Sequence, residues 1–243
     1  MRLRGENPIY SRADYSAEWT VQATYKGVAA KSMLLLIITA ISAYSIAINV
    51  GTDWSFGTMI GALVIAPIAA FIFVILAHKN AQLAFIYSIL YAIFEGAFLG
   101  IISLIVAYQA GTDAVLFAMA GTFGALFVML ILYAARIIRV GQGFKNFILA
   151  ALGAVFFFMI IGIVMWLTVG TEYFSSPLYI AIVVFSLIIS VLFLLYDFNR
   201  IENYVSGNAG KEHEWSLSLG LITTIVWIYI EILRLVLILS RKR

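Results

Sequence analysis

The sequence predicts an all-α integral membrane protein, folded as a bundle of seven transmembrane helices. Hydrophobic residues make up 64% of the 243-residue chain and charged residues only 11%, against roughly 45–50% and roughly 25% in soluble domains. So few charged side chains could not cover a soluble globule of this size. The apolar residues also gather into seven runs, each long enough for the about 20 residues that one crossing needs.

Each run is bounded by turn residues or charges, which places the ends of the predicted helices. A transmembrane β-barrel needs alternating strands of about ten residues, and the runs do not alternate. In chain order, the runs are 32–50, 56–77, 83–108, 114–135, 147–169, 178–198 and 215–239. The boundaries are Gly51 to Asp53, His78 to Asn80, Gly111 to Asp113, Arg136 to Lys145 and Ser175 to Pro177.

The runs define one membrane domain, 32–239, between a polar N-terminal tail, 1–31, and a basic C-terminal tail, 240–243. The N-terminal tail carries three acids, which a secretory signal lacks, so the first span is expected to be retained. Loops on the side of the N-terminus carry eleven Lys and Arg residues, whereas the opposite side carries three, all in the C-terminal tail. The positive-inside rule therefore predicts a cytoplasmic N-terminus. If the C-terminal tail is cytoplasmic instead, one span is re-entrant, and the sixth is the candidate.

Composition also excludes several functions. The chain has no cysteine, which removes disulfides, thiolate metal sites and cysteine nucleophiles. A net charge of +3 is too small to indicate nucleic acid as a partner. All six lysines lie outside the runs, so a retinal Schiff base has no site. The acids of the last two runs resemble those of intramembrane aspartyl proteases, but the Gly-x-Gly-Asp motif of those enzymes is absent. We expect neither an enzyme nor a bound cofactor.

Four ionisable residues lie within the runs: Glu95, Asp197, Glu231 and Arg234. Such groups are rare in hydrocarbon and mark candidate functional sites. Glu231 precedes Arg241 by ten residues, or about 15 Å, which is half of a roughly 30 Å core. It must therefore be paired, hydrated or protonated, and Arg234 at i+3 is a possible intrahelical partner. Glu95 is either a buried protonated carboxyl or an auxiliary acid in an ion pathway.

Two predicted helices carry matching polar stripes. On a helical wheel, Ser186 and Ser190 share a face with Asp197, and Gly220 and Thr224 share a face with Glu231. Such facing stripes predict a hydrated or proton-accessible seam. Asp197 has a second interpretation, as a surface carboxylate paired with Arg200.

The sequence leaves open whether the two carboxylates of the seam meet. An antiparallel hairpin centred near Glu214 places Asp197 level with Glu231, provided that the sixth helix continues to about Tyr204 and that the start of the seventh projects from the membrane. If the helices end with the apolar runs, the two are level only by accident. Close carboxylates share a proton and form a pH-responsive latch. They can also attract calcium weakly and transiently, since two carboxylates fall short of the six to eight oxygens of a tight site.

Two pairs of glycines, Gly57 with Gly61 and Gly96 with Gly100, have the small-xxx-small spacing that lets transmembrane helices pack closely. We interpret both pairs as packing motifs.

Three segments resemble the Bax inhibitor-1/YccA family. They are 91–100 (YAIFEGAFLG), 196–202 (YDFNRIE) and 227–235 (WIYIEILRL). Their order across the spans carries the resemblance, which covers the chain from about residue 30 to its end. The N-terminal tail, with Asn7-Pro8 and Thr20-Val21-Gln22, is similar to a bacterial branch of that family.

The resemblance implies a central seventh helix wrapped by two three-helix layers, together with a pH-sensitive calcium leak. It also implies a pH-sensing pair of aspartates, which carries over to Asp197 and Glu231. Glutamate here replaces the second aspartate, and the second span has no arginine to latch the acidic pair, as some members have.

Two functions follow as hypotheses. The first is a pH-sensitive cation (calcium) leak gated by Asp197 and Glu231, with Glu95, Arg200 and Arg234 as auxiliary or ion-pairing residues. The alternative is a non-conducting membrane regulator that binds other membrane proteins. In either case the expected surroundings are the lipid bilayer, with calcium or protons as ligands, in a bacterial plasma membrane.

Overall fold

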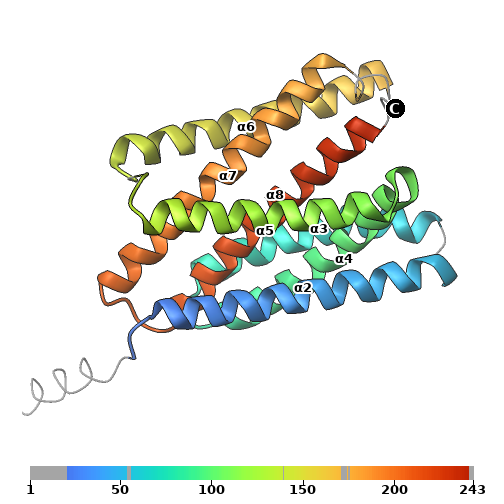
Figure 1. The fold of residues 1–243 in the computed structure, drawn as a ribbon. Coiled ribbons are helices and arrows are strands. Elements are labelled where there is room, and N and C mark those ends of the chain that lie inside the picture. Colours follow the sequence, from blue (N-terminus) through green and yellow to red (C-terminus); the bar gives the residue numbers. More distant parts are fainter. Residues whose placement is uncertain (1–20, 54–55, 139, 171–173, 175, 241–243) are drawn as a thin grey trace, which may run out of the picture.

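The computed structural model describes residues 21–53, 56–138, 140–170, 174 and 176–240. Over these residues the chain forms seven helices long and apolar enough to cross a membrane, and no strand. The predicted fold class is therefore confirmed (Figure 1). In chain order the helices are α2 (Tyr25–Asp53), α3 (Phe56–Lys79), α4 (Ala84–Ala110), α5 (Thr112–Ala134), α6 (Gln142–Val169), α7 (Pro177–Ser206) and α8 (His213–Ser240).

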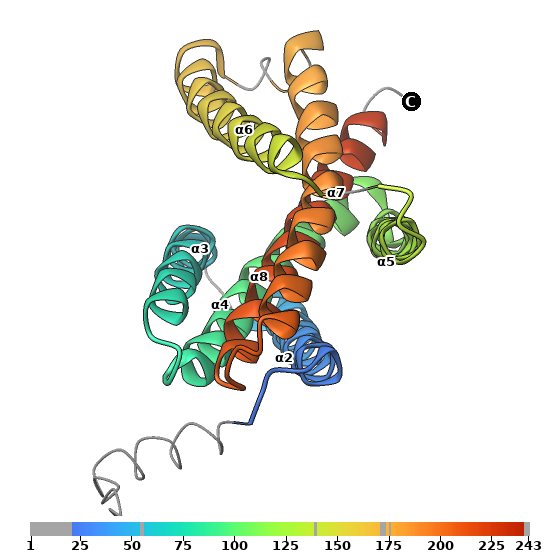
Figure 2. The same ribbon diagram turned by 90° about the vertical axis from the view of Figure 1, so that its left-hand side faces the viewer.

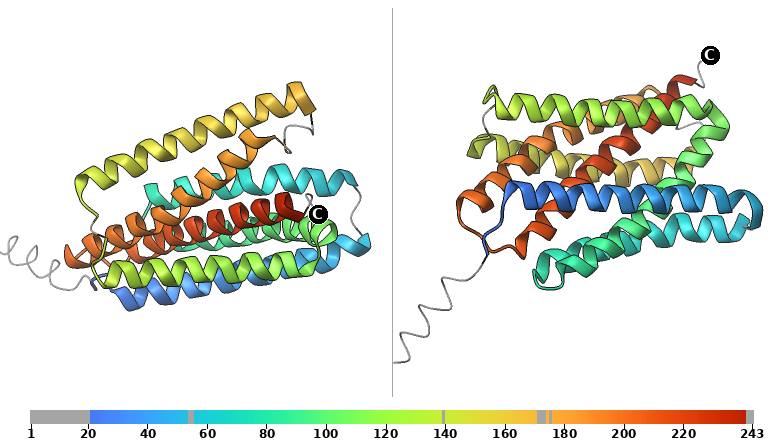
Figure 3. Two further views of the ribbon diagram at one scale, coloured as in Figure 1. Left: turned by 45° about the horizontal axis from the view of Figure 1, so that its top comes forward. Right: turned by 60° about the horizontal axis from the view of Figure 1, so that its bottom comes forward.

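Helix α8 is the centre of the bundle. It packs against α2, α3, α4, α5 and α7, and it is the most buried of the seven spans. Figure 2 shows it between α2 and α4 on one side and α5 and α7 on the other. Helices α2 and α3 both pack against α4, and helices α5 and α6 both contact α7. Helix α6 lies at the outside of the bundle (Figure 3). The expected central seventh helix is confirmed.

Several helices extend beyond the apolar runs that predict them. α7 continues through the polar segment 199–206 as one unbroken helix of 30 residues, which is long and apolar enough to cross a membrane. α2 begins at Tyr25, seven residues before its run. In hydrocarbon the backbone must form helices, because no water is present to hydrogen-bond its N–H and C=O groups. A helix need not end where the hydrocarbon ends, since a polar segment in the interface can continue the same backbone hydrogen bonds.

Two short connections are fixed by local backbone chemistry. Gly111 alone joins α4 to α5 at φ +87°, a conformation that glycine adopts without a steric penalty. At the start of α7, the Ser176 hydroxyl accepts the Tyr179 N–H at 3.2 Å, and Pro177 occupies the first turn. This combination of a serine cap and an early proline stabilises a helix N-terminus.

The two glycine pairs behave differently. Gly96 lies against α2, where an added Cβ would be 2.5 Å from the Thr39 carbonyl oxygen. Gly100, one turn later, approaches the Ala43 carbonyl in the same way. This pair is a packing motif, as predicted. Around Gly61, by contrast, an added Cβ meets nothing within 4 Å, so the prediction of close packing within this chain is wrong there.

We expect Gly96→Ala and Gly100→Ala each to lower the stability of the protein by about 1–3 kcal/mol, because the added methyl must displace rigid backbone of α2. Gly61→Ala is the matched control, since it makes the same change in a helix with open space around it. Thermal unfolding of the purified protein in detergent measures all three. Equal melting temperatures for the Gly96, Gly100 and Gly61 variants would contradict the close contact between α2 and α4.

Candidate functional site

The polar stripes of α7 and α8 face each other and form what we call the polar seam: Ser186, Ser190 and Asp197 of α7 with Gly220, Thr224 and Glu231 of α8. At one level of the seam, the Thr224 hydroxyl donates to Asp197 Oδ2 at 2.5 Å. The carboxyl group is 4% exposed. This hydrogen bond satisfies an acid that would otherwise be costly to bury.

At the second level of the seam, Glu231 is 3% exposed and one of its oxygens collects three donors. Oε1 accepts the Ser186 hydroxyl at 2.8 Å, the Trp227 indole N–H at 3.1 Å and an Arg234 N–H at 3.3 Å. The ion pair with Arg234 has the i,i+3 spacing expected from the sequence. The other oxygen, Oε2, is buried and has no hydrogen-bond partner among the described residues. Glu231 therefore retains one oxygen that can take a proton, a water molecule or a cation.

The structure does not bring Asp197 and Glu231 together. Asp197 is level with Thr224, which precedes Glu231 by seven residues, or about 10 Å along the helix axis. α7 does continue past Tyr204, but the contact of Asp197 with Thr224 centres the hairpin between residues 210 and 211 instead of near Glu214. In this conformation the two acids cannot share one proton or jointly bind one calcium ion.

Arg200 lies close to Asp197 without a salt bridge to it. Its Nη1 contacts His78 Nε2 at 3.3 Å, and its guanidinium lies over the ring of Tyr204, 5.9 Å from the centroid. Both Arg200 and Asp197 approach Gly220, where an added Cβ would be 3.9 Å from Arg200 Nη1 and 4.0 Å from Asp197 Oδ1. Arg200 thus closes the end of the seam and is not the direct partner of Asp197.

Glu95 is buried in α4, 8% exposed, and has no hydrogen bond to either acid of the seam. One turn before it, the Tyr91 side chain bonds to Thr223 of α8. Farther along α4, Ser103 and the Tyr229 hydroxyl are 2.8 Å apart. Glu95 therefore belongs to the interface between α4 and α8. Within the described ranges, no group of three or more His, Cys, Asp or Glu side chains could hold a metal ion.

A fourth buried acid was not singled out by the sequence analysis. Glu214, at the start of α8, is 1% exposed. Its Oε2 pairs with Lys31 Nζ of α2 at 2.5 Å, and its Oε1 accepts the backbone N–H and the hydroxyl of Thr24 at 2.8 and 3.1 Å. Gly27 leaves the space that the Glu214 carboxylate occupies, since an added Cβ there would collide with it.

The segment before α2 is held at the same place. Ala23 N–H donates to the Ala209 carbonyl and Lys211 N–H to the Val21 carbonyl, both at 2.7 Å. The start of α8 is therefore covered by α2 and by the segment before it. The position of Lys31 directly before the first apolar run was the one signal in the sequence that pointed to a buried ion pair. Nothing in the sequence identifies its partner as Glu214, 183 positions away.

The fold and the seam define a polytopic α-helical membrane protein whose buried acids lie between its last two spans, on its third span and between its first and last spans. Residues 7–241 match the family described as Bax inhibitor 1 like, and the chain belongs to that family. A comparison with curated proteins found no match.

We expect Lys31→Met to lower the stability by on the order of 3 kcal/mol, because it leaves Glu214 charged, buried and without its cation. For a chain of this size, that lowers the melting temperature in detergent by roughly 5–10 °C. Lys26→Met is the control, since Lys26 is exposed and forms no salt bridge to a described residue. Similar melting temperatures for the two variants would contradict the importance of the Lys31–Glu214 pair.

Proposed function

We propose that the protein is a pH-sensitive cation leak, with calcium as a permeant ion, in which Asp197 and Glu231 act as two successive carboxylate stations along the polar seam. The observation that carries the proposal is the buried Oε2 of Glu231, which has no hydrogen-bond partner among the described residues. An intramembrane acid with an unsatisfied oxygen is typical of a site for protons or ions and unusual in a purely structural contact.

The geometry of the two acids favours conduction of a cation over its tight binding. Each carboxyl group has its own hydroxyl donor, Thr224 for Asp197 and Ser186 for Glu231. The two stations are about 10 Å apart along α8, so an ion moving between them exchanges one weak site for the next. Weak, separate sites allow an ion to enter and also to leave, as conduction requires.

The pH dependence follows from the charge of the two acids. Protonation removes the negative charge that attracts a cation, and the neutral carboxyl groups can remain hydrogen-bonded in a closed seam. Deprotonation places one or two buried negative charges there, which water and cations must enter to compensate. The leak is therefore expected to be small in acid and to increase as the pH rises.

We expect calcium entry into dye-loaded liposomes containing the purified protein to increase from about pH 6 to about pH 8. Asp197→Asn and Glu231→Gln should each weaken that pH dependence, because the amide keeps the shape of the side chain but cannot ionise and only the other acid remains. Thr224→Val keeps Asp197 but removes its donor, so it should move the pH profile to higher pH, since the donor favours the ionised form.

The matched controls are Asp113→Asn and Glu212→Gln, which make the same two changes at exposed positions. They should retain the wild-type profile. Flux that depends neither on pH nor on any of the three seam substitutions would overturn the carboxylate mechanism. If there is no flux at any pH, the leak is wrong, and the alternative of a non-conducting regulator that binds other membrane proteins takes its place.

A further inference from the structure

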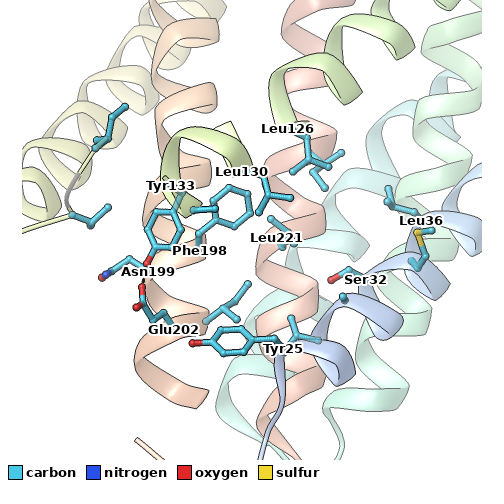
Figure 4. Close-up of a pocket in the computed structure, with 18 of the residues that line it drawn as sticks. Tyr25, Ser32, Leu36, Leu126, Leu130, Tyr133, Phe198, Asn199, Glu202 and Leu221 are labelled. Carbon is cyan, nitrogen blue, oxygen red and sulfur yellow. Dashed lines mark hydrogen bonds between the residues drawn. The ribbon is translucent and has the colours of Figure 1, made fainter. Parts of the chain in front are cut away.

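A large cavity lies beside the seam, where α7 and α8 meet α2 and α5. It has a volume of about 1010 Å³ and is enclosed by α2, α5, the segment after α5, α7 and α8. This volume is at the upper end of the roughly 300–1,000 Å³ that is usual for small-molecule sites. Figure 4 shows the cavity between Tyr133, Phe198 and Glu202 on one side and Ser32 and Leu36 on the other.

The cavity is open to the outside of the bundle. Two of its lining residues, Met33 of α2 and Leu130 of α5, are 66% and 48% exposed. Because both belong to membrane-spanning helices, this opening faces the hydrocarbon of the bilayer. A ligand can therefore enter sideways from the membrane, and its apolar part would lie along Leu36, Leu126 and Leu130.

The opposite end of the cavity is polar and carries both signs of charge. Arg136 and Glu202 both line it, together with Tyr25 and Asn199. Glu202 accepts the Tyr133 hydroxyl, and Arg136 forms no salt bridge to any residue within the described ranges. Arg136 also follows the end of α5 at φ +54°, where helices usually place glycine. Arg136 thus lines this end of the cavity with a backbone conformation that is costly for a residue other than glycine.

A buried hydroxyl points to a ligand at intermediate depth. Ser32 lines the cavity, is only 6% exposed, and its oxygen has no hydrogen-bond partner among the described residues. Its side chain is directed from α2 toward the cavity (Figure 4). Ser32 follows Tyr25 by seven residues, so it lies about 10 Å deeper along α2. In a lipid that extends from the polar end into the bilayer, the ester groups occupy this intermediate depth.

We propose that this cavity binds one bilayer phospholipid with a phosphoethanolamine headgroup. Arg136 binds the phosphate, Glu202 binds the primary ammonium group, and Ser32 donates to an ester carbonyl oxygen. The acyl chains follow the apolar wall out through the opening between Met33 and Leu130. A headgroup with both charges matches a lining that holds one cation, Arg136, and one acid, Glu202, better than a purely anionic one does. A primary ammonium also donates hydrogen bonds that a quaternary one cannot. The proposal is independent of ion conduction.

The test is native mass spectrometry of the purified protein after exchange into an equimolar mixture of phosphatidylethanolamine, phosphatidylcholine and phosphatidylglycerol with identical acyl chains. We expect one retained phosphatidylethanolamine per protein, preferred at least about fivefold over the other two. Glu202→Gln keeps an acceptor for Tyr133 but should remove the preference over phosphatidylcholine. Arg136→Gln and Ser32→Ala should each lower the retention of phosphatidylethanolamine severalfold.

Leu130→Trp narrows the opening beside Met33 through which the acyl chains leave, and should abolish retention. Leu116→Trp is its control, because it makes the same change at a lipid-facing position of α5 outside the cavity. Retention that survives Leu130→Trp, or that shows no preference for the primary ammonium, would overturn the proposal.

A second measurement uses the wild-type chain and does not depend on the folding of a variant. A phosphatidylethanolamine with a photoreactive acyl chain should cross-link mainly to 25–36 and 126–140 in vesicles. Cross-links spread evenly over the lipid-facing surfaces of α3 and α6 would also overturn the proposal.

Discussion

The bundle depends on the hydrogen bonds that polar side chains of α7 and α8 give each other away from water. In hydrocarbon an unsatisfied polar group is costly, so the contacts of Asp197 with Thr224 and of Glu231 with Ser186 determine how the two helices align. Apolar side chains fill the rest of the interface, but they would tolerate other alignments. Because α8 is the helix around which the others pack, the register of this hairpin positions the whole bundle.

One end of the hairpin is fixed a second time by the contact of Glu214 with Lys31 and Thr24. This contact connects the first and last spans, which are the farthest apart in sequence, and the backbone bonds of Ala23 and Lys211 reinforce it. A buried ion pair contributes little net stability but is costly to break. Its main effect is therefore to exclude other arrangements of α2 against α8.

The fold was largely predictable, because hydropathy is a strong signal when the solvent is a bilayer. The seven spans and the two facing stripes follow from run length and from helical periodicity. The register of the stripes does not, since it depends on where the α7–α8 turn falls, and that turn is set by contacts of Ala209 and Lys211 with the segment before α2. The partners of Glu214 and the cavity beside α7 were not predictable either, because residues distant in sequence form them.

Helix α7 separates the two proposed sites and contributes to both. Asp197 faces α8, whereas Asn199, two residues later, lines the cavity. Two residues rotate a helix by about 200°, so the two side chains lie on nearly opposite faces. The seam requires α7 to remain within hydrogen-bond distance of Thr224, and a ligand in the cavity contacts the back of the same turn of α7. In the two proposals, a lipid would contact the helices of the seam from outside, through α7 and through Leu221 and Ile225 of α8, whereas protonation of Asp197 would act within the seam. The two proposals thus assign a ligand site and a proton site to the same helix, α7.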